Sequence, residues 1–413
     1  MNIAFFTDAY YPRINGVAVS VHSYAKKLAE LGHNVCIVCC NYDGSTDEFN
    51  HKKNHFDIKL DDIPENMKIF RLSSINVFVS KEDKSAKVTA WHDVKHTMDA
   101  FKPDIIHINS EFVVGYFGIM YARHRNIASV YTFHTLWDEY VDGYIKFMPI
   151  YSAKKIAKEL IKFYLKRANI IITPTEKIAD VVRSYKIGRD DDIKILPTGI
   201  PQALDISKIN VKPLYFNQLH KLLPKVQKKS ILLYVGRVVK EKNLEFLFPV
   251  FQEVKKQIKD TMLVFVGGGP ELDNLKEKAK KLGYARDIIF AGYRSREELA
   301  YFYSVSDVFV FPSKTETQGL VTIEAMMASL PVVAIGEKGT VDVMQGDNGG
   351  FMVKDDVKDF TDKVLALLKN KELREKKASE AKEWAQQWSI DILTEKLISY
   401  YKEAIILHDS KNK

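Results

Sequence analysis

The sequence predicts an α/β protein made of two domains, each a doubly wound parallel β-sheet with helices on both faces. Short apolar runs typical of buried strands alternate with amphipathic helical patterns along most of the chain. The length of 413 residues gives room for two or three domains of about 150 residues each. No apolar run approaches the ~18 residues that cross a bilayer.

The first half begins with a strand, helix and strand that form a βαβ unit. Residues 3–6 and 35–40 are the strands, and residues 18–31 are the helix, which Gly32 ends. Further strands are expected at 103–108, 129–133, 170–174 and 193–196, and a helix is expected at 81–101. These elements define a predicted N-terminal domain of residues 1–200.

Residues 201–229 contain three prolines and little periodicity, so they are interpreted as a linker. A second, C-terminal domain follows at residues 230–388. Its expected strands are at 230–235, 262–266, 287–290, 307–311, 331–335 and 349–353. A final helix at 389–410 is expected to pack back on the N-terminal domain.

The most informative stretch is the loop and helix start at residues 312–325. They follow a buried strand, so they lie at the carboxyl edge of the sheet, where open α/β sheets bind ligands. The chain turns at Gly319 and enters a helix at Leu320, whose free N–H groups suit a phosphate. Glu316 and Glu324 flank this turn and suit neutral hydroxyls of a sugar and a ribose. The alternative, two solvated surface glutamates, fits Glu324 poorly because its neighbours are apolar.

A second loop of the same domain carries two cations. Arg237 and Lys242 follow the strand at 230–235 and its terminal Gly236, an arrangement that suits a diphosphate. Two solvated surface cations are the alternative. Gly268 and Gly269 follow the next strand and allow a ligand to approach the backbone. Together with the two glutamates, these residues predict a pocket for a nucleotide-diphosphate sugar.

Two residues of the first half are weaker candidates. Gly16 lies in a loop that could approach a diphosphate, but a tight turn explains it equally well. His134 follows the strand at 129–133, where it could contact a substrate or serve as a structural histidine.

The net charge of +8 is modest, and its distribution is more informative. A basic amphipathic helix at residues 151–167 is either an ordinary surface helix or a docking element for an anionic membrane surface. No nucleic-acid motif is present, so nucleic acid is not an expected partner. The three cysteines fall in one strand and form neither a disulfide framework nor a zinc motif, so we expect a reducing cytoplasm and no metal. The N-terminus lacks a basic leader, so we expect no signal peptide.

These motifs resemble the large family of retaining GT-B glycosyltransferases that use nucleotide-sugar donors. Glu316 and Glu324 match the E-x7-E motif of that family. The other matching segments of the C-terminal half are 236–237, 240–243, 266–270, 307–309 and 331–333, and the sparser N-terminal matches are 7–16, 32–33 and 103–107. Ser329 departs from the family, which commonly has glycine there. The resemblance implies a GT-B fold, with two Rossmann-like domains facing across a cleft, the N-terminal one for the acceptor and the C-terminal one for the nucleotide sugar.

The resemblance also implies roles for individual residues. Arg237 and Lys242 would hold the diphosphate and stabilise the departing UDP, and Glu316 would position the donor sugar. Glu324 would hold the ribose, and His134 would contact the sugar. The residues expected to line the donor site are Gly16, Gly236, Gly268, Gly269, Gly319, Leu320 and Glu324. No tightly bound cofactor or metal is expected, and retention of the anomeric configuration is expected.

Within the family, residues 315–320, 107–115 and 134–136 resemble bacterial diacylglycerol glucosyltransferases. This implies transfer of glucose from UDP-glucose to a lipid such as 1,2-diacylglycerol, by a peripheral protein at the inner face of the cell membrane. Transfer to phosphatidylinositol, a polysaccharide or a soluble small molecule is the alternative. A further alternative is a noncatalytic protein that binds nucleotide sugars.

Overall fold

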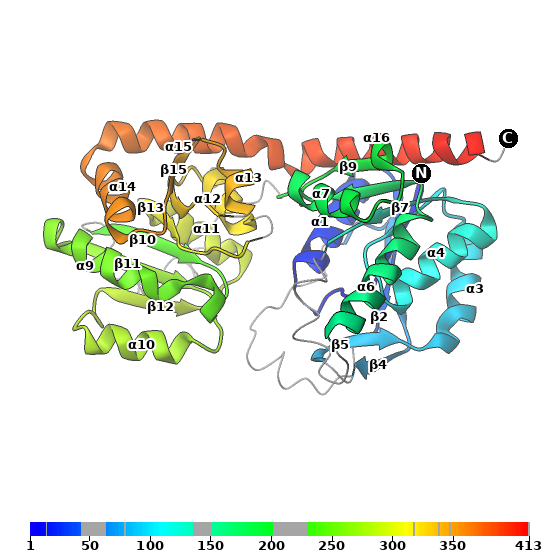
Figure 1. Cartoon of the computed structure of the whole chain (residues 1–413), viewed down its shortest axis with the longest axis horizontal. Coiled ribbons are helices and arrows are strands. Elements are labelled where there is room, and N and C mark those ends of the chain that lie inside the picture. The colour runs from blue at the N-terminus through cyan, green and yellow to red at the C-terminus, as the bar shows by residue number, and fades with distance from the viewer. Residues whose placement is uncertain are drawn as a thin grey trace. The chain divides into compact units, whose positions relative to one another are not determined.

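The computed structural model describes residues 1–13, 15–42, 63–77, 80–134, 150–200, 229–316, 319–337, 339–346 and 348–411. The described residues divide into two compact units (Figure 1). Unit 1 contains the residues up to Gly199 and those from Ile390 onward, and unit 2 contains the residues from Ile200 to Ser389. The predicted linker, apart from residue 229, lies outside the described residues. No helix in the described ranges combines the length and apolar composition of a membrane span.

Unit 1 is built on a seven-stranded sheet in which all neighbouring strands are parallel, in the order β3-β2-β1-β6-β7-β8-β9. The strands are β1 (Asn2–Thr7), β2 (Asn34–Cys40), β3 (Met67–Leu72), β6 (Ile105–Ile108), β7 (Ala128–Thr132), β8 (Ile170–Thr173) and β9 (Ile193–Ile195). The direction of winding reverses between β1 and β6. Such a reversal is the switch point at which doubly wound sheets bind ligands.

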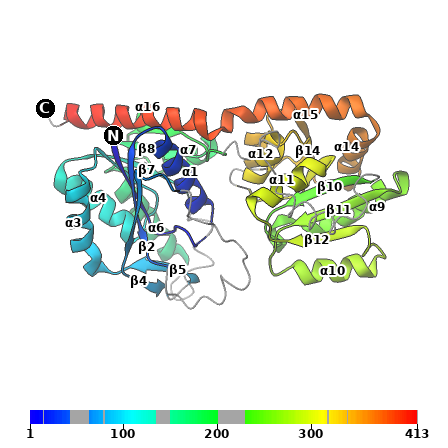
Figure 2. The ribbon, with the colours of Figure 1, turned by 180° about the vertical axis from the view of Figure 1, so that it is seen from behind.

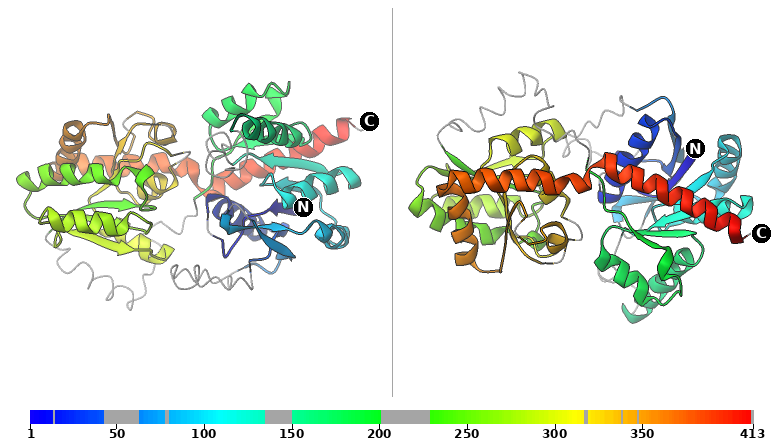
Figure 3. Two further views of the ribbon diagram at one scale, coloured as in Figure 1. Left: turned by 60° about the horizontal axis from the view of Figure 1, so that its bottom comes forward. Right: turned by 90° about the horizontal axis from the view of Figure 1, so that it is seen from above.

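Two groups of helices cover the two faces of this sheet. One face packs against α1 (Gly16–Glu30) and α16 (Ile390–Lys411), which also contact each other (Figure 3). The other face packs against α3 (Trp91–Phe101), α4 (Val113–Arg125), α6 (Ile150–Leu165) and α7 (Glu176–Ser184). Strand side chains alternate between the two cores, since Phe6 belongs to one and Phe5 to the other.

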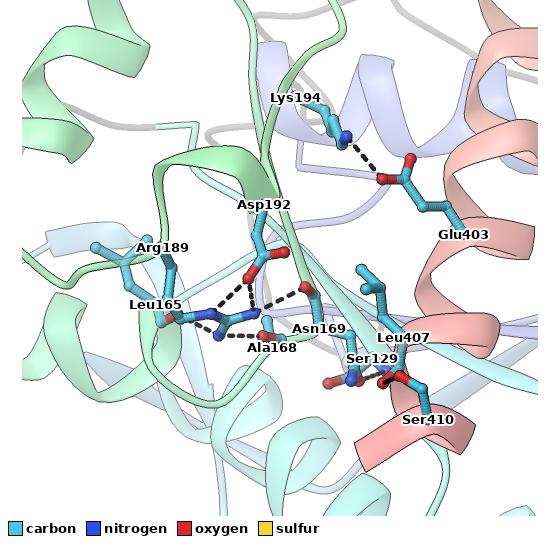
Figure 4. A network of polar contacts seen from close by, with 10 residues as sticks. All are labelled: Ser129, Leu165, Ala168, Asn169, Arg189, Asp192, Lys194, Glu403, Leu407 and Ser410. Atoms are coloured by element: carbon cyan, nitrogen blue, oxygen red, sulfur yellow. Dashed lines mark hydrogen bonds and ion pairs between the residues drawn. The ribbon is translucent and has the colours of Figure 1, made fainter.

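Polar contacts hold α16 and α6 in unit 1. Glu403 of α16 pairs with Lys194 at 2.7 Å, and Tyr401 lies 2.7 Å from Nδ1 of buried His107. Arg189 donates to the carbonyl oxygens of Leu165, Ala168 and Asn169 at the end of α6 and pairs with Asp192 (Figure 4). A cation at a helix C-terminus satisfies otherwise unpaired carbonyl groups.

Unit 2 repeats the architecture with a six-stranded parallel sheet in the order β12-β11-β10-β13-β14-β15 (Figure 2). The strands are β10 (Ser230–Val235), β11 (Thr261–Val266), β12 (Ile288–Gly292), β13 (Val308–Phe311), β14 (Val332–Ile335) and β15 (Gly350–Val353). The helices are α9 (Leu247–Gln257), α10 (Leu272–Lys281), α11 (Arg296–Val305), α12 (Leu320–Met327), α13 (Gly339–Val343), α14 (Val357–Lys369) and α15 (Lys371–Ala385). Here the winding reverses between β10 and β13.

One expected element is wrong. The helix predicted for residues 81–101 begins only at Trp91, after a 3₁₀ turn at Val88–Ala90. The preceding residues form β5 (Ser80–Ala86), which pairs antiparallel with β4 (Ser74–Val77). The polar, mixed-charge run has no apolar period of its own, so pairing with a neighbouring strand decides its conformation.

Candidate active site

The switch point of unit 2 brings two of the predicted loops together. Gly236 and Arg237 follow β10, and Lys242 lies in the 3₁₀ turn Lys240–Lys242 of the same loop. Glu316 follows β13, which is hydrogen-bonded to β10. The carboxyl ends of parallel neighbours share one edge of a sheet, so both loops lie at the predicted ligand edge.

Lys242 and Glu316 are in direct contact at this edge. Lys242 Nζ lies 2.6 Å from Glu316 Oε1, and both side chains are less than one-fifth exposed. Ser313 Oγ donates to the same Glu316 oxygen at 2.9 Å. An ion pair largely shielded from water is more strongly coupled than a surface pair. The ion pair therefore holds the lysine ammonium group in place at this edge.

The glycine loop after β11 packs closely against its neighbours. Gly268 accepts a hydrogen bond from the amide of Val238 at 2.9 Å and another from Tyr293 Oη at 3.1 Å. A Cβ at Gly268 would lie 2.3 Å from the Tyr293 ring. Any larger residue would have to displace this aromatic side chain, so glycine allows the close packing of this loop on Tyr293. Gly269 follows and accepts from the amide of Leu272 at 3.1 Å, at the start of α10.

Helix α12 starts at the same edge, four residues after Glu316. Gly319 precedes it with a left-handed φ of 69°, which a side chain would strain. Gly319, as the N-cap residue, has no side chain that could cap the helix, which begins at Leu320. The hydroxyl of Thr322 in the first turn is buried and has no hydrogen-bond partner among the described residues. An N-terminus without a side-chain cap retains partial positive charge and suits an anion.

Glu324 lies on the second turn of α12 and is half-buried. Tyr303 Oη donates to its Oε2 at 3.1 Å. This hydroxyl is the kind of partner that the apolar surroundings of the carboxylate require. Arg237 differs from the other predicted residues: its side chain is 72% exposed, and its contact with Glu241 is 4.0 Å long. It is therefore free to reorient toward a ligand at little cost.

In unit 1, His134 follows β7 and is held by Asn109, which follows β6. His134 Nε2 lies 2.9 Å from Asn109 Oδ1. Desolvation lowers the pKa of His134 to about 4 and that of His107 to about 3. Both imidazoles are therefore neutral near pH 7. They border a small cavity that Tyr24 of α1 also lines.

The switch point of unit 1 is closed by Asp8, just after β1. Its carboxylate accepts from Ser110 Oγ at 2.5 Å and from the amide of Val114 at 3.2 Å, so it caps α4. Burial raises the pKa of Asp8 to about 6. Gly16 begins α1, and Asn15 caps that helix by accepting from the amide of Ala18. A Cβ at Gly16 would have no atom within 4 Å, so its predicted approach to a diphosphate stays a prediction.

Several neighbours of the predicted residues were not singled out from the sequence, namely Asp8, Asn109, Tyr303, Ser313 and Thr322. Asp8 and Asn109 directly follow strands and Ser313 comes two residues after one, and this position is the signal that could have indicated them. Across the part of the chain that the structure describes, no group of three or more His, Cys, Asp or Glu side chains could hold a metal ion.

Comparisons with known proteins agree with this architecture. Residues 216–384 match the family model described as glycosyl transferases group 1, and residues 14–204 match glycosyltransferase family 4. The alpha-monoglucosyldiacylglycerol synthase of Streptococcus pneumoniae is 30% identical over 81% of this chain and 71% of its own. The enzyme of that name from Acholeplasma laidlawii is 30% identical over 86% of each chain.

A solved structure has the same fold. Anabaena HepE in complex with UDP-glucose superimposes with a TM-score of 0.69 and 16% identity, over 97% of this chain and 99% of that one. The family matches span both units, and the two relatives are matched over most of their length. The chain therefore belongs to the GT-B glycosyltransferases of group 1 and family 4.

Proposed function

We propose that this glycosyltransferase moves glucose from UDP-glucose to a membrane lipid such as 1,2-diacylglycerol, with retention of the anomeric configuration. The observation that carries the proposal is the shielded Lys242–Glu316 ion pair at the sheet edge where α12 starts, with Gly319 as its N-cap residue. The names of the two synthase relatives support the lipid acceptor, and the HepE complex supports a UDP-sugar donor.

The proposed reaction breaks the bond between the anomeric carbon and the diphosphate and joins that carbon to the acceptor oxygen. Negative charge grows on the departing UDP. Lys242, held by Glu316, and the exposed Arg237 stabilise this charge. The first-turn N–H groups of α12 add a fixed partial positive charge. A diphosphate oxygen takes the acceptor proton, so no protein base is assigned.

The donor hydroxyls are assigned to the two carboxylates. Glu316 accepts from hydroxyls of the sugar, and Glu324 accepts from the ribose. Accepting from a neutral hydroxyl keeps each buried charge hydrogen-bonded without bringing it against a phosphate. The loops that contain Gly236, Gly268 and Gly269 are assigned to the nucleotide. Without side chains, these three residues pack closely on Tyr234, Tyr293 and Val238.

We further propose that unit 1 binds the acceptor and docks peripherally on the inner, anionic face of the cell membrane. The outer face of α6 supports this, since Ile156 is 57% exposed and Leu160 is 41% exposed. Phe112 and Tyr116 at the start of α4 are 51% and 45% exposed, and Tyr116 stacks on Phe163 of α6. The apolar side chains of α6 therefore fall into two groups. Tyr164 lies in the core, whereas others, such as Ile156 and Leu160, are exposed beside lysines.

The proposal is tested by incubating the purified protein with radiolabelled UDP-glucose, UDP-galactose and GDP-mannose in parallel, with diacylglycerol in anionic vesicles. We expect label from UDP-glucose in the lipid fraction, and NMR of the product should show the α-anomer. Labelled lipid only from another donor would overturn the assignment of the sugar. Transfer only to soluble acceptors would overturn the assignment of the lipid. Tight UDP-glucose binding without any transfer or hydrolysis would favour a noncatalytic protein.

A further inference from the structure

Asn109 determines which nitrogen of His134 carries the proton. Its amide Nδ2 lies 3.3 Å from the carbonyl oxygen of His107, to which it donates. The opposite amide orientation would bring two oxygens together there, so Oδ1 must face His134. Oδ1 can only accept, and the 2.9 Å contact therefore requires a hydrogen on His134 Nε2.

The charge state of the imidazole follows from its surroundings. The other titratable side chains around the cavity are His107 from β6 and Tyr24 from α1. Burial keeps His107 neutral and raises the pKa of Tyr24, whose hydroxyl donates to the carbonyl of Pro197. Tyr401 of α16 and Thr132 occupy the two ring nitrogens of His107. Among the described residues no acid lines this cavity, so no carboxylate of that lining stabilises an imidazolium.

A neutral imidazole with its proton on Nε2 has a lone pair on Nδ1. This nitrogen accepts a hydrogen bond and cannot donate one. Among the ligands that a glycosyltransferase holds, a sugar hydroxyl is the matching donor, whereas a phosphate oxygen is not.

We propose that Asn109 is a positioning residue, which fixes His134 as the neutral Nε2–H tautomer so that Nδ1 accepts a hydrogen bond from a hydroxyl of the transferred sugar. The proposal rests on the glycosyl transfer proposed above. To the proposed transfer, it adds the residue that sets the orientation of His134 and the direction of the hydrogen bond to the sugar.

The first test compares pH profiles of kcat/KM for Asn109→Asp and Asn109→Ala. An aspartate still accepts from Nε2–H, but its charge raises the pKa of His134 toward neutrality. We expect Asn109→Asp to stay within about tenfold of the wild type at pH 8 and to lose about tenfold per pH unit below the raised pKa. Asn109→Ala lacks the acceptor and should lose up to about 100-fold at every pH.

Asn66→Asp is the matched control, because Asn66 also donates to backbone carbonyls in unit 1, those of Ala29 and His33. Its pH profile should follow the wild type. Equal losses for the Asp and Ala variants of Asn109 at pH 8, or an Asn109→Asp profile without the new acid limb, would overturn the proposal.

The second test does not depend on activity. In protein labelled with ¹⁵N-histidine, His134→Gln identifies the His134 ring signals. We expect the Nε2–H form in the wild type from pH 5.5 to 8, and a mixture of tautomers in Asn109→Ala. An Nδ1–H form in the wild type overturns the inference, even if Asn109→Ala fails to fold. The expected spectra without lipid transfer would leave the positioning intact and reject the proposed function alone.

Discussion

Units 1 and 2 share one architecture, but the side chains at the ligand edges of their sheets differ in charge. In unit 1, Asn15 and Asp8 cap the helices that start at the edge, and His134 is kept neutral by burial. In unit 2, the N-cap residue of α12 is Gly319, which has no side chain, and Lys242 and Glu316 form an ion pair. The fold supplies the same positions in both units. The side chains after the strands decide whether an edge suits a charged diphosphate or neutral hydroxyls.

The largest effect is expected from Lys242→Ala. Removing the fixed cation of the unit 2 edge should lower kcat for sugar transfer by about 1,000-fold, because charge on the departing diphosphate loses its partner. Lys240→Ala is the matched control, as it makes the same change at an exposed position of the same 3₁₀ turn. Thermal unfolding and circular dichroism should show that both variants remain folded. Equal activities of the two variants would contradict the proposed role of Lys242 at the unit 2 edge.

The second largest effect concerns the outer face of unit 1. The test variant replaces Lys154, Lys155, Lys158 and Lys162 with serine. It should bind anionic vesicles about 100-fold more weakly at low salt, with a smaller difference at high salt. Vesicle sedimentation at several ionic strengths measures this. The control changes lysines of helix α10 in unit 2, namely Lys276, Lys280 and Lys281. Unchanged binding of the α6 variant would remove the membrane role of that helix.

Glu324→Gln tests whether the half-buried acid of α12 recognises a hydroxyl. The amide is similar in size but accepts more weakly, so KM for the donor should rise about tenfold while kcat changes little. Steady-state kinetics with varied donor concentration measures the two constants. A fall in kcat at constant KM would instead assign Glu324 to the chemical step. Tyr303→Phe removes one donor to Glu324 and should have the smaller effect.

The smallest effect concerns the neutral histidines of unit 1. Their folded pKa values, about 3 for His107 and about 4 for His134, lie below the unfolded value of 6.5. The unfolded chain therefore takes up protons first, and stability falls as the pH drops below 6.5. Asp8, with its pKa raised to about 6, opposes this trend between pH 6 and 3.8.

Each histidine should cost about 1 kcal/mol between pH 7.5 and 5.5, from 1.36 kcal/mol per pKa unit. Thermal unfolding at the two pH values measures the loss. His107→Gln should reduce the loss by about 1 kcal/mol, the contribution of that histidine. The same loss in that variant would assign the pH dependence to other groups.

The two-sheet fold and the site edges could be predicted because apolar strands and helices alternate, and because polar residues follow the strands. Glu324 was recognisable as a carboxylate among apolar neighbours. The contact between Lys242 and Glu316 was not predictable, because it depends on β10 and β13 being neighbours in the sheet. The hydrophobic periodicity of a segment indicates a strand but not its place in the strand order. The same reason hid the Asn109–His134 contact. The β4–β5 hairpin was missed because pairing, not pattern, determines it.

The assignment of α16 to unit 1 has a consequence for biosynthesis. During translation, every strand of the first sheet leaves the ribosome long before the helix that covers one of its faces, because all of unit 2 is made in between. Tyr401, whose hydroxyl contacts His107, is synthesised near the end of translation. The helices and strands of unit 2 lie in one continuous segment of the chain. Unit 2 can therefore fold on the ribosome before α16, the last helix of unit 1, has been synthesised.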